Sequence, residues 1–114
     1  MEAVLSNVEL RKGSVELLLL SILETEPRHG YEIGKLIEQR SGGRLRFRIS
    51  SLYPVLCRME DRAWIEGWWV EKPGERRRRF YRLTENGIRA LAEQRKTWNE
   101  FTHAVNLVLG PSHA

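Results

Sequence analysis

The order of sequence patterns between residues 50 and 83 constrains the fold more than any other feature of this chain. Apolar residues recur there at spacings of three or four positions, which predicts an amphipathic helix. This stripe comprises Leu52, Leu56, Met59 and Ala63. Two β-prone runs follow, at 64–71 and 77–83, and the turn sequence Lys72-Pro73-Gly74-Glu75 separates them. We therefore expect a helix followed directly by a β-hairpin.

Two further helices are predicted before this segment. Residues 15–24 are apolar nearly all round, which is typical of a buried helix. Ser14 is placed to cap that helix, and Pro27 ends it. Residues 30–40 carry apolar side chains on one face, and Gly42-Gly43 ends the second helix.

Shorter patterns complete the N-terminal part of the chain. Residues 1–10 have apolar positions at helical spacing, which predicts a short helix or an arm. Residues 45–49 alternate apolar and basic side chains, the period of a short half-buried strand. Ser50 or Ser51 is expected to cap the helix that follows, with Pro54 in its first turns.

The last predicted helix starts at Thr84, has Gly87 as a weak point in its first turn, and ends at Gly110-Pro111. With roughly 25 residues, it would be about 37 Å long. The preceding domain is too small to cover an apolar stripe of that length, so we expect a second copy of the chain to cover it. The stripe comprises Ile88, Leu91, Trp98, Phe101, Val105 and Val108.

The predicted order of elements is helix, helix, short strand, helix, hairpin and helix. This order predicts a mainly α fold with a small β wing. The expected architecture is a winged helix-turn-helix plus a long C-terminal dimerisation helix. We place a winged-helix DNA-binding domain at 1–84, including an N-terminal arm at 1–12. The dimerisation helix then occupies 85–110, and 111–114 form a tail.

Positive charge is concentrated in the same central segment. The whole chain has a net charge of +4, but residues 44–82 hold eleven Lys/Arg against five Asp/Glu, so that this segment alone carries +6. Fifteen of the 19 basic residues are arginine, which favours bidentate contacts with phosphate or guanine. A helix suits the major groove of double-stranded DNA, and a basic ribbon suits phosphates or the minor groove.

Several other classes of protein are disfavoured. Cys57 is the only cysteine, so no disulfide forms within one chain, which fits a cytoplasmic location. The N-terminus lacks the pattern of a signal peptide, and the longest apolar run, 17–20, is too short to cross a membrane. The histidines are scattered, and catalytic or phosphate-binding motifs are missing, so we expect no metal, no cofactor and no enzyme activity.

Four sequence elements together resemble the PadR family of transcriptional regulators, specifically the short form with one C-terminal helix. They are Gly13-Ser14 with the Leu-rich run after it, His29-Gly30-Tyr31-Glu32-Ile33, Leu52-Tyr53-Pro54-Val55-Leu56 with Arg58-Met59-Glu60, and Arg78-Arg79-Phe80-Tyr81-Arg82-Leu83-Thr84 with Gly87. The resemblance covers roughly residues 10–110. It implies a homodimeric bacterial repressor of a palindromic operator, which a small-molecule effector releases in many members.

The candidate DNA contacts lie in the helix after residue 49 and in the wing. They are Ser50, Ser51, Tyr53, Pro54, Arg58 and Arg62 in the helix, and Lys72, Arg76, Arg77, Arg78 and Arg79 in the wing. Ser51 would hold a phosphate at the helix N-terminus, and Arg58 would reach a base or a phosphate. The alternatives are that Arg58 and Arg62 pair with neighbouring carboxylates such as Glu60, that Tyr53 packs against the helix at 30–40, and that the arginine run is simply solvated.

Other notable side chains have both a structural and a functional interpretation. Trp98 and Phe101 lie near the expected dimer axis, where they either fill the dimer core or hold a flat aromatic effector, as some PadR relatives do. We expect His29 to pack or to cap the second helix, and Tyr31 to pack on the core. Cys57 is either a half-buried side chain or a thiol sensor.

A different function would follow if the wing docked proteins instead of DNA. Trp64 stands where the family usually has a small aliphatic residue, and Trp68-Trp69 make the first wing strand unusually aromatic. Ser50 also departs from the family pattern, which usually has glycine there. The alternative is therefore a winged-helix protein interaction module, although such a module does not require +6 over residues 44–82.

Overall fold

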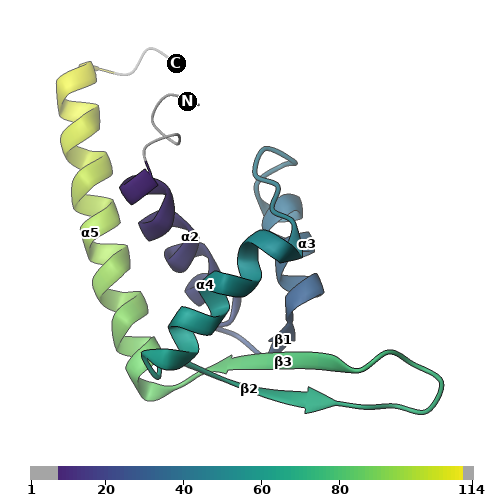
Figure 1. Ribbon diagram of the computed structural model, residues 1–114. Coiled ribbons are helices and arrows are strands. Elements are labelled where there is room, and N and C mark those ends of the chain that lie inside the picture. Colours follow the sequence, from purple (N-terminus) through teal and green to yellow (C-terminus); the bar gives the residue numbers. More distant parts are fainter. Residues whose placement is uncertain (1–7, 112–114) are drawn as a thin grey trace.

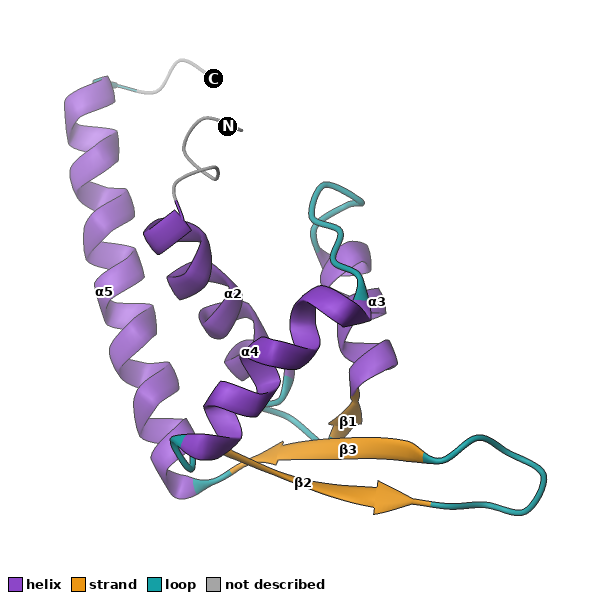
Figure 2. Ribbon diagram, viewed as in Figure 1, coloured by secondary structure: helices purple, strands orange, loops and turns teal. Residues whose placement is uncertain are grey.

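The predicted fold class is confirmed, with helices that pack around a small antiparallel sheet (Figures 1 and 2). The computed structural model describes residues 8–111 of the 114-residue chain, and side chains from residue 13 onward. Its elements are α2 (Val8–Ile22), β1 (Arg28–His29), α3 (Gly30–Arg40), α4 (Ile49–Asp61), β2 (Ile65–Val70), β3 (Arg78–Leu83) and α5 (Glu85–Leu109). Helix α5 runs alongside α2, and the β2–β3 hairpin extends away from the helices (Figure 1).

The three strands form one antiparallel sheet in the order β1-β3-β2. In the hairpin, Trp68 pairs with Phe80 and Trp69 pairs with Arg79. Because successive side chains on a strand point to opposite faces, Trp69 and Arg79 lie on the face that also carries the buried Tyr81. Trp68 and Phe80 lie on the outer face.

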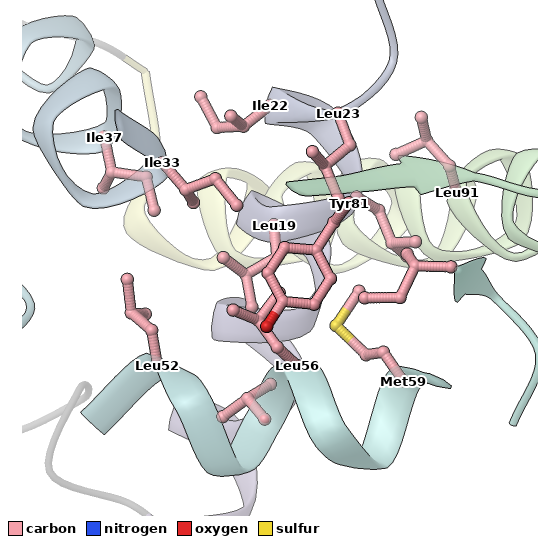
Figure 3. Close-up of a cluster of buried hydrophobic side chains, with 13 residues drawn as sticks. Leu19, Ile22, Leu23, Ile33, Ile37, Leu52, Leu56, Met59, Tyr81 and Leu91 are labelled. Atoms are coloured by element: carbon pink, nitrogen blue, oxygen red, sulfur yellow. The ribbon is translucent and has the colours of Figure 1, made fainter. Parts of the chain in front are cut away.

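The hydrophobic core lies where α2, α3 and α4 meet the base of the hairpin (Figure 3). Leu19 and Leu56 are fully buried there, as is Met59. Tyr81 brings the sheet into the same cluster, and burial raises the pKa of its hydroxyl to about 12. The core therefore fixes the base of the wing against α4.

Helix α2 does not begin where the sequence patterns placed it. The helix is continuous from Val8 through Gly13 and Ser14, so the predicted cap at Ser14 is wrong. The hydroxyl of Ser14 is instead buried, without a hydrogen-bond partner among the described residues. A single glycine costs a helix only about 1 kcal/mol, which the packed apolar turns that follow can offset. Of the predicted N-terminal arm, residues 1–7 lie outside the described part of the chain.

The short strand predicted at 45–49 is also wrong. This segment is irregular up to Arg48, and the third strand of the sheet is β1, which pairs with Phe80 and Tyr81 of β3. The alternation nevertheless has a structural cause, because Leu45 and Phe47 pack against the core while the arginines between and beside them are exposed. Half-burial therefore occurs here without a ladder of hydrogen bonds between strands.

Both ends of α4 differ from the prediction. Arg48 is the N-cap residue and makes no side-chain cap, whereas Ser50 and Ser51 lie inside the first turn. Ala63 was expected in the buried stripe but is exposed and has a φ of 60°, in the left-handed region that ends the helix. Val55 is buried alongside the predicted stripe residues.

The start of α5 is fastened to the turn between α4 and β2. The predicted start at Thr84 is close to the observed one: α5 begins at Glu85, and Thr84 is its N-cap, since its Oγ1 accepts a hydrogen bond from the backbone N–H of Gly87 at 3.0 Å. The same hydroxyl donates a hydrogen bond to the carbonyl oxygen of Ala63 at 2.5 Å. The backbone N–H of Thr84 donates to the carbonyl oxygen of Trp64 at 3.0 Å. Gly87 is not a weak point, because a Cβ atom there would lie 1.9 Å from the Trp64 oxygen.

We predict that Gly87→Ala lowers the free energy of unfolding by at least about 2 kcal/mol, because backbone atoms of α5 and of the turn would have to separate. Gly13→Ala is the matched control, since a Cβ atom there meets nothing within 4 Å and alanine favours a helix. Urea unfolding followed by circular dichroism measures both changes. Equal stabilities for the two variants would contradict the close contact.

Candidate nucleic-acid interface

The N-terminal turn of α4 is an exposed, uncapped helix end. Ser50, Ser51 and Pro54 are exposed, and Tyr53 keeps 47% of its surface accessible. The backbone N–H groups of Ser51 and of the next residue both donate to the carbonyl oxygen of Arg48, and the first turn contains no acidic residue. The two N–H groups before them are left without a partner among the described residues, a geometry that suits an anion.

The N-terminal half of α3 lies against this end of α4, because α3 presents two glycines to it. A Cβ atom on Gly30 would lie 2.6 Å from Cδ1 of Ile49, and one on Gly34 would lie 3.4 Å from the carbonyl oxygen of Phe47. Tyr31 follows Gly30 and is 73% exposed, so the expectation that it packs on the core is wrong. Its exposure adds an aromatic side chain to the surface formed by α3 and α4.

His29 caps α3, as expected for a structural histidine. Its Nδ1 accepts a hydrogen bond from the backbone N–H of Glu32 at 3.2 Å. Its ring packs edge-on against Phe80, with 5.3 Å between the ring centroids. Burial and then the positive charge of Arg78 lower the pKa of His29 below 6.5, while Glu32 acts in the opposite direction.

The two arginines of the α4 region have different environments. Arg62 donates to Glu16 of α2 at 2.8 Å, and its guanidinium lies 5.0 Å from the centroid of the Trp64 ring. It is therefore paired, though with a carboxylate 46 residues away instead of a neighbour in α4. Arg58 is half-buried, with no ion pair among residues 13–111. Tyr53 does not pack away against α3, so both it and Arg58 stay available to a ligand.

The wing arginines divide in the same way. Arg79 donates to Glu60 of α4 at 2.8 Å, and this hydrogen bond raises the pKa of Arg79. Its guanidinium lies over Gly67, where a Cβ atom would be 2.9 Å away. Arg77 lies 3.5 Å from Glu71 and 4.2 Å from the centroid of the Trp69 ring.

The remaining predicted wing contacts have no carboxylate partner among the described side chains. Lys72 and Arg76 are exposed near the hairpin turn. Arg78 is exposed as well, and its Nη1 lies 2.9 Å from Nε2 of His29. Of the predicted wing contacts, these three side chains are therefore the ones without a carboxylate partner, and not the whole arginine run.

Sequence reasoning missed one cation of this surface. Arg48 is exposed at the N-cap of α4, and no ion pair holds it within the described chain. The signal was present in the alternation at 45–49, because burial of Leu45 and Phe47 directs Arg46 and Arg48 outward. Because the same alternation predicts a short strand, it did not identify Arg46 and Arg48 as candidate DNA contacts.

The three wing tryptophans do not share one surface. Trp64 is half-buried and packs against the hydrophobic core. Trp68 stacks on Phe80 on the outer face of the sheet, with 6.1 Å between ring centroids. Trp69 lies on the opposite face, below Arg77. The continuous aromatic surface that a protein interaction module would use is therefore not formed by these residues.

Helix α5 carries exposed apolar residues toward its C-terminal end. In the middle of the helix, Arg95 forms an ion pair with Glu24 at 2.8 Å. Ile88, Trp98, Phe101, Val105 and Val108 of the predicted stripe are exposed, Val108 by 87%. Leu91 must be removed from the dimerisation set, because it is 2% exposed and belongs to the core of its own subunit. Leu107 and Leu109 are exposed too and were not predicted.

Among the described residues, no group of three His, Cys, Asp or Glu side chains is placed to bind a metal ion. Cys57 is half-buried. Between residues 8 and 111, no helix combines the length and the apolar character needed to cross a membrane.

We predict that Arg62→Ala lowers the free energy of unfolding by about 1–2 kcal/mol, because it leaves the carboxylate of Glu16 without its cation. Glu16 is only 12% exposed, so water cannot fully replace the arginine. Arg58→Ala is the matched control on the same helix and should change stability by no more than about 0.5 kcal/mol. Urea unfolding at one protein concentration compares the two, and equal losses would contradict this division.

We also predict that acid weakens the fold through His29. The pKa of this side chain is lower in the folded chain than in the unfolded chain, where it is near 6.5. The unfolded chain therefore binds the proton at higher pH, so the free energy of unfolding falls as the pH drops below about 6.5. His29→Asn keeps a capping acceptor without the titration, and unfolding at several pH values should show a shallower dependence. An unchanged dependence would contradict the assignment.

Comparison with known proteins agrees with this architecture. The family model of the transcriptional regulator PadR-like family matches residues 19–93. A transcriptional regulator from Clostridium thermocellum is 25% identical, with a TM-score of 0.81 over 90% of this chain and 96% of that one. A PadR-like transcriptional regulator from Bacillus cereus is 27% identical, with a TM-score of 0.75 over 91% and 99% of the two chains.

A structure of Bacillus subtilis PadR in complex with operator DNA shares the fold. It is 22% identical, and its TM-score is 0.63 over 68% of this chain and 44% of that chain. The family match extends over more than half of the 114 residues, from the core of α2 into the first turns of α5. The chain therefore belongs to the PadR-like family of transcriptional regulators.

Proposed function

We propose that this chain is a homodimeric repressor that binds a palindromic operator in double-stranded DNA. Helix α4 would enter the major groove with its N-terminal turn foremost, and the wing would lie along the adjacent minor groove. The observation that carries this proposal is the exposed, uncapped N-terminal end of α4, together with cations that have no carboxylate partner among the described residues. Arg48 lies at that end as the N-cap, Arg58 lies in the last turn of the same helix, and Lys72 and Arg76 lie in the wing.

The charge pattern supports DNA as the ligand. Two arginines near the contact between α4 and the wing are already neutralised, Arg62 by Glu16 and Arg79 by Glu60. Lys72, Arg76 and Arg78 are exposed and have no carboxylate partner among the described residues, so that phosphates can replace water around them. Operator binding by Bacillus subtilis PadR, a protein of the same fold, agrees with this arrangement.

Dimerisation through α5 is proposed on the basis of its uncovered apolar residues. Val108 and Leu109 are at least 70% exposed in one subunit, and Phe101 is 44% exposed. A second copy would cover these side chains and place two α4 helices on one side of the dimer. Two half-sites of a palindrome would then be read together.

An effector site between the α5 helices is a further part of the proposal. Trp98 and Phe101 lie 6.0 Å apart between ring centroids, with their planes tilted by 42°. The pair can hold a flat aromatic molecule or fill the dimer core. Titration of aromatic compounds against the wild type and Trp98→Phe distinguishes these roles: the effector role requires weaker ligand binding in a variant that remains dimeric.

We predict strong salt dependence of DNA binding. If about six phosphates are neutralised per dimer, the logarithm of the DNA-binding constant should fall with the logarithm of the salt concentration with a slope of about −5. Operators selected from a random DNA pool provide the specific site, and fluorescence anisotropy measures binding at several salt concentrations. A shallow slope, or equal affinity for the selected palindrome and for random duplex, would contradict the proposed function.

We predict a contrast between two arginines of the wing. Arg76→Ala should weaken binding to specific and random DNA alike and reduce the salt slope by about 1, because it removes a phosphate contact. Arg79→Ala is the matched control, since the Glu60 carboxylate already occupies its guanidinium. That variant should keep the salt slope and lose stability instead. The assignment is wrong if the two variants show the opposite pattern.

A further inference from the structure

His29 lies between two hydrogen-bond donors. The backbone N–H of Glu32 points at Nδ1 from 3.2 Å, and Nη1 of Arg78 lies 2.9 Å from Nε2. A neutral imidazole has one N–H donor and one acceptor nitrogen, so it can accept from only one of these groups. The other contact then brings two donors together, and an acceptor that lies against both would satisfy them.

The helix determines which nitrogen accepts. The N–H of Glu32 belongs to the first turn of α3 and cannot turn away, whereas the side chain of Arg78 is exposed and mobile about its bonds. Nδ1 is therefore the acceptor, and the proton resides on Nε2. Two donors, Nε2–H of His29 and the guanidinium of Arg78, then lie side by side, so that one acceptor can contact both.

Both donors line a pocket of about 280 Å³ on the outer face of the wing. Lys72 and Arg76 line the pocket together with Arg78, and Phe80 and Val70 contribute apolar surface. The carboxylates at its edge are Glu32 and Glu75. Glu32 accepts a hydrogen bond from Arg28 at 3.1 Å, so its charge is already compensated.

We propose that Nε2–H of His29 and the guanidinium of Arg78 together hold one phosphate oxygen of the DNA backbone. This inference rests on the proposed function and adds one uncharged hydrogen-bond donor to the cations proposed to contact DNA. A phosphate oxygen between the two groups accepts from both and removes the contact between like donors. His29 would thus cap α3 through one nitrogen and position the backbone through the other.

The position in the fold favours a DNA phosphate over a free anion. The lining residues of the pocket come from β1, the start of α3, the facing ends of β2 and β3, and the hairpin turn. Figure 1 shows β1 and the start of α3 beside β3. Gly30, which follows His29, contacts Ile49 in the first turn of α4, so the start of α3 connects the pocket to the proposed recognition helix. Lys72, Arg76 and Arg78 are all exposed, so a continuous backbone can reach them.

A double-mutant cycle tests the shared phosphate. His29→Asn keeps an oxygen that caps α3 but removes the Nε2–H donor, and Arg78→Ala removes the guanidinium. On random-sequence duplex at low salt, each variant should bind about 3- to 10-fold more weakly than the wild type. The double variant should be no more than about 2-fold weaker than the weaker single variant, because one site is lost in each case.

Controls separate the site from the fold and from general electrostatics. Lys96→Ala removes an exposed charge from α5, away from the wing, and should bind DNA as the wild type does. Circular dichroism should show that His29→Asn retains the helix content. Fully additive losses in the cycle, or wild-type affinity in His29→Asn, would overturn the shared site while the wild type still bound DNA. Loss of salt-dependent DNA binding by the wild type would instead contradict the proposed function.

Nitrogen-15 NMR of the histidine rings identifies the ligand. In the free protein at neutral pH, the His29 signals should show a bare Nδ1 and a protonated Nε2. Addition of duplex should shift the Nε2–H signal, and the shift should be absent in Arg78→Ala. A shift with millimolar inorganic phosphate but none with bound duplex would overturn the assignment to DNA and indicate a small-anion site. A signal that neither ligand moves would overturn the site.

Discussion

The contact between the start of α5 and the turn after α4 sets the geometry of the whole molecule. Gly87 lets the first turn of α5 reach the backbone of Trp64, and Thr84 adds hydrogen bonds to both residues of that turn. Helix α4, the wing and helix α5 therefore leave one junction in fixed directions. In a dimer, the spacing between two DNA-reading surfaces follows from these directions, so a rigid junction is what allows a fixed half-site spacing.

Ion pairs divide the arginines into a structural and a functional set. Three of them tie elements together: Arg62 joins α4 to α2, Arg79 joins the wing to α4, and Arg95 joins α5 to the end of α2. A partly buried pair of this kind orients its elements more than it stabilises them, since desolvation offsets much of the Coulomb attraction. The arginines without carboxylates, such as Arg58 and Arg76, keep their full charge for a phosphate. Charge counting alone cannot make this division.

Local patterns predicted the helices and the hairpin, because periodicity and turn signals depend on residues a few positions apart. Contacts between distant residues escaped prediction. The pairing of β1 with β3 spans about fifty residues, and Arg62 finds Glu16 across 46. Of the candidate site, the exposure of Ser51, Tyr53 and Pro54 agrees with the prediction. The sorting of the wing arginines could not be predicted, because it depends on which face of the sheet meets α4.

The pairing of the hairpin is set close to its base and not at its tip. Trp68 stacks on Phe80 on one face, while Arg79 lies over Gly67 and reaches Glu60 on the other. A slip of one position would exchange the two faces and separate both sets of partners. The segment between Val70 and Arg78 contributes to neither of these two sets of contacts. Its length can vary, and with it the distance over which the wing follows a groove, without any change in how the helices are packed.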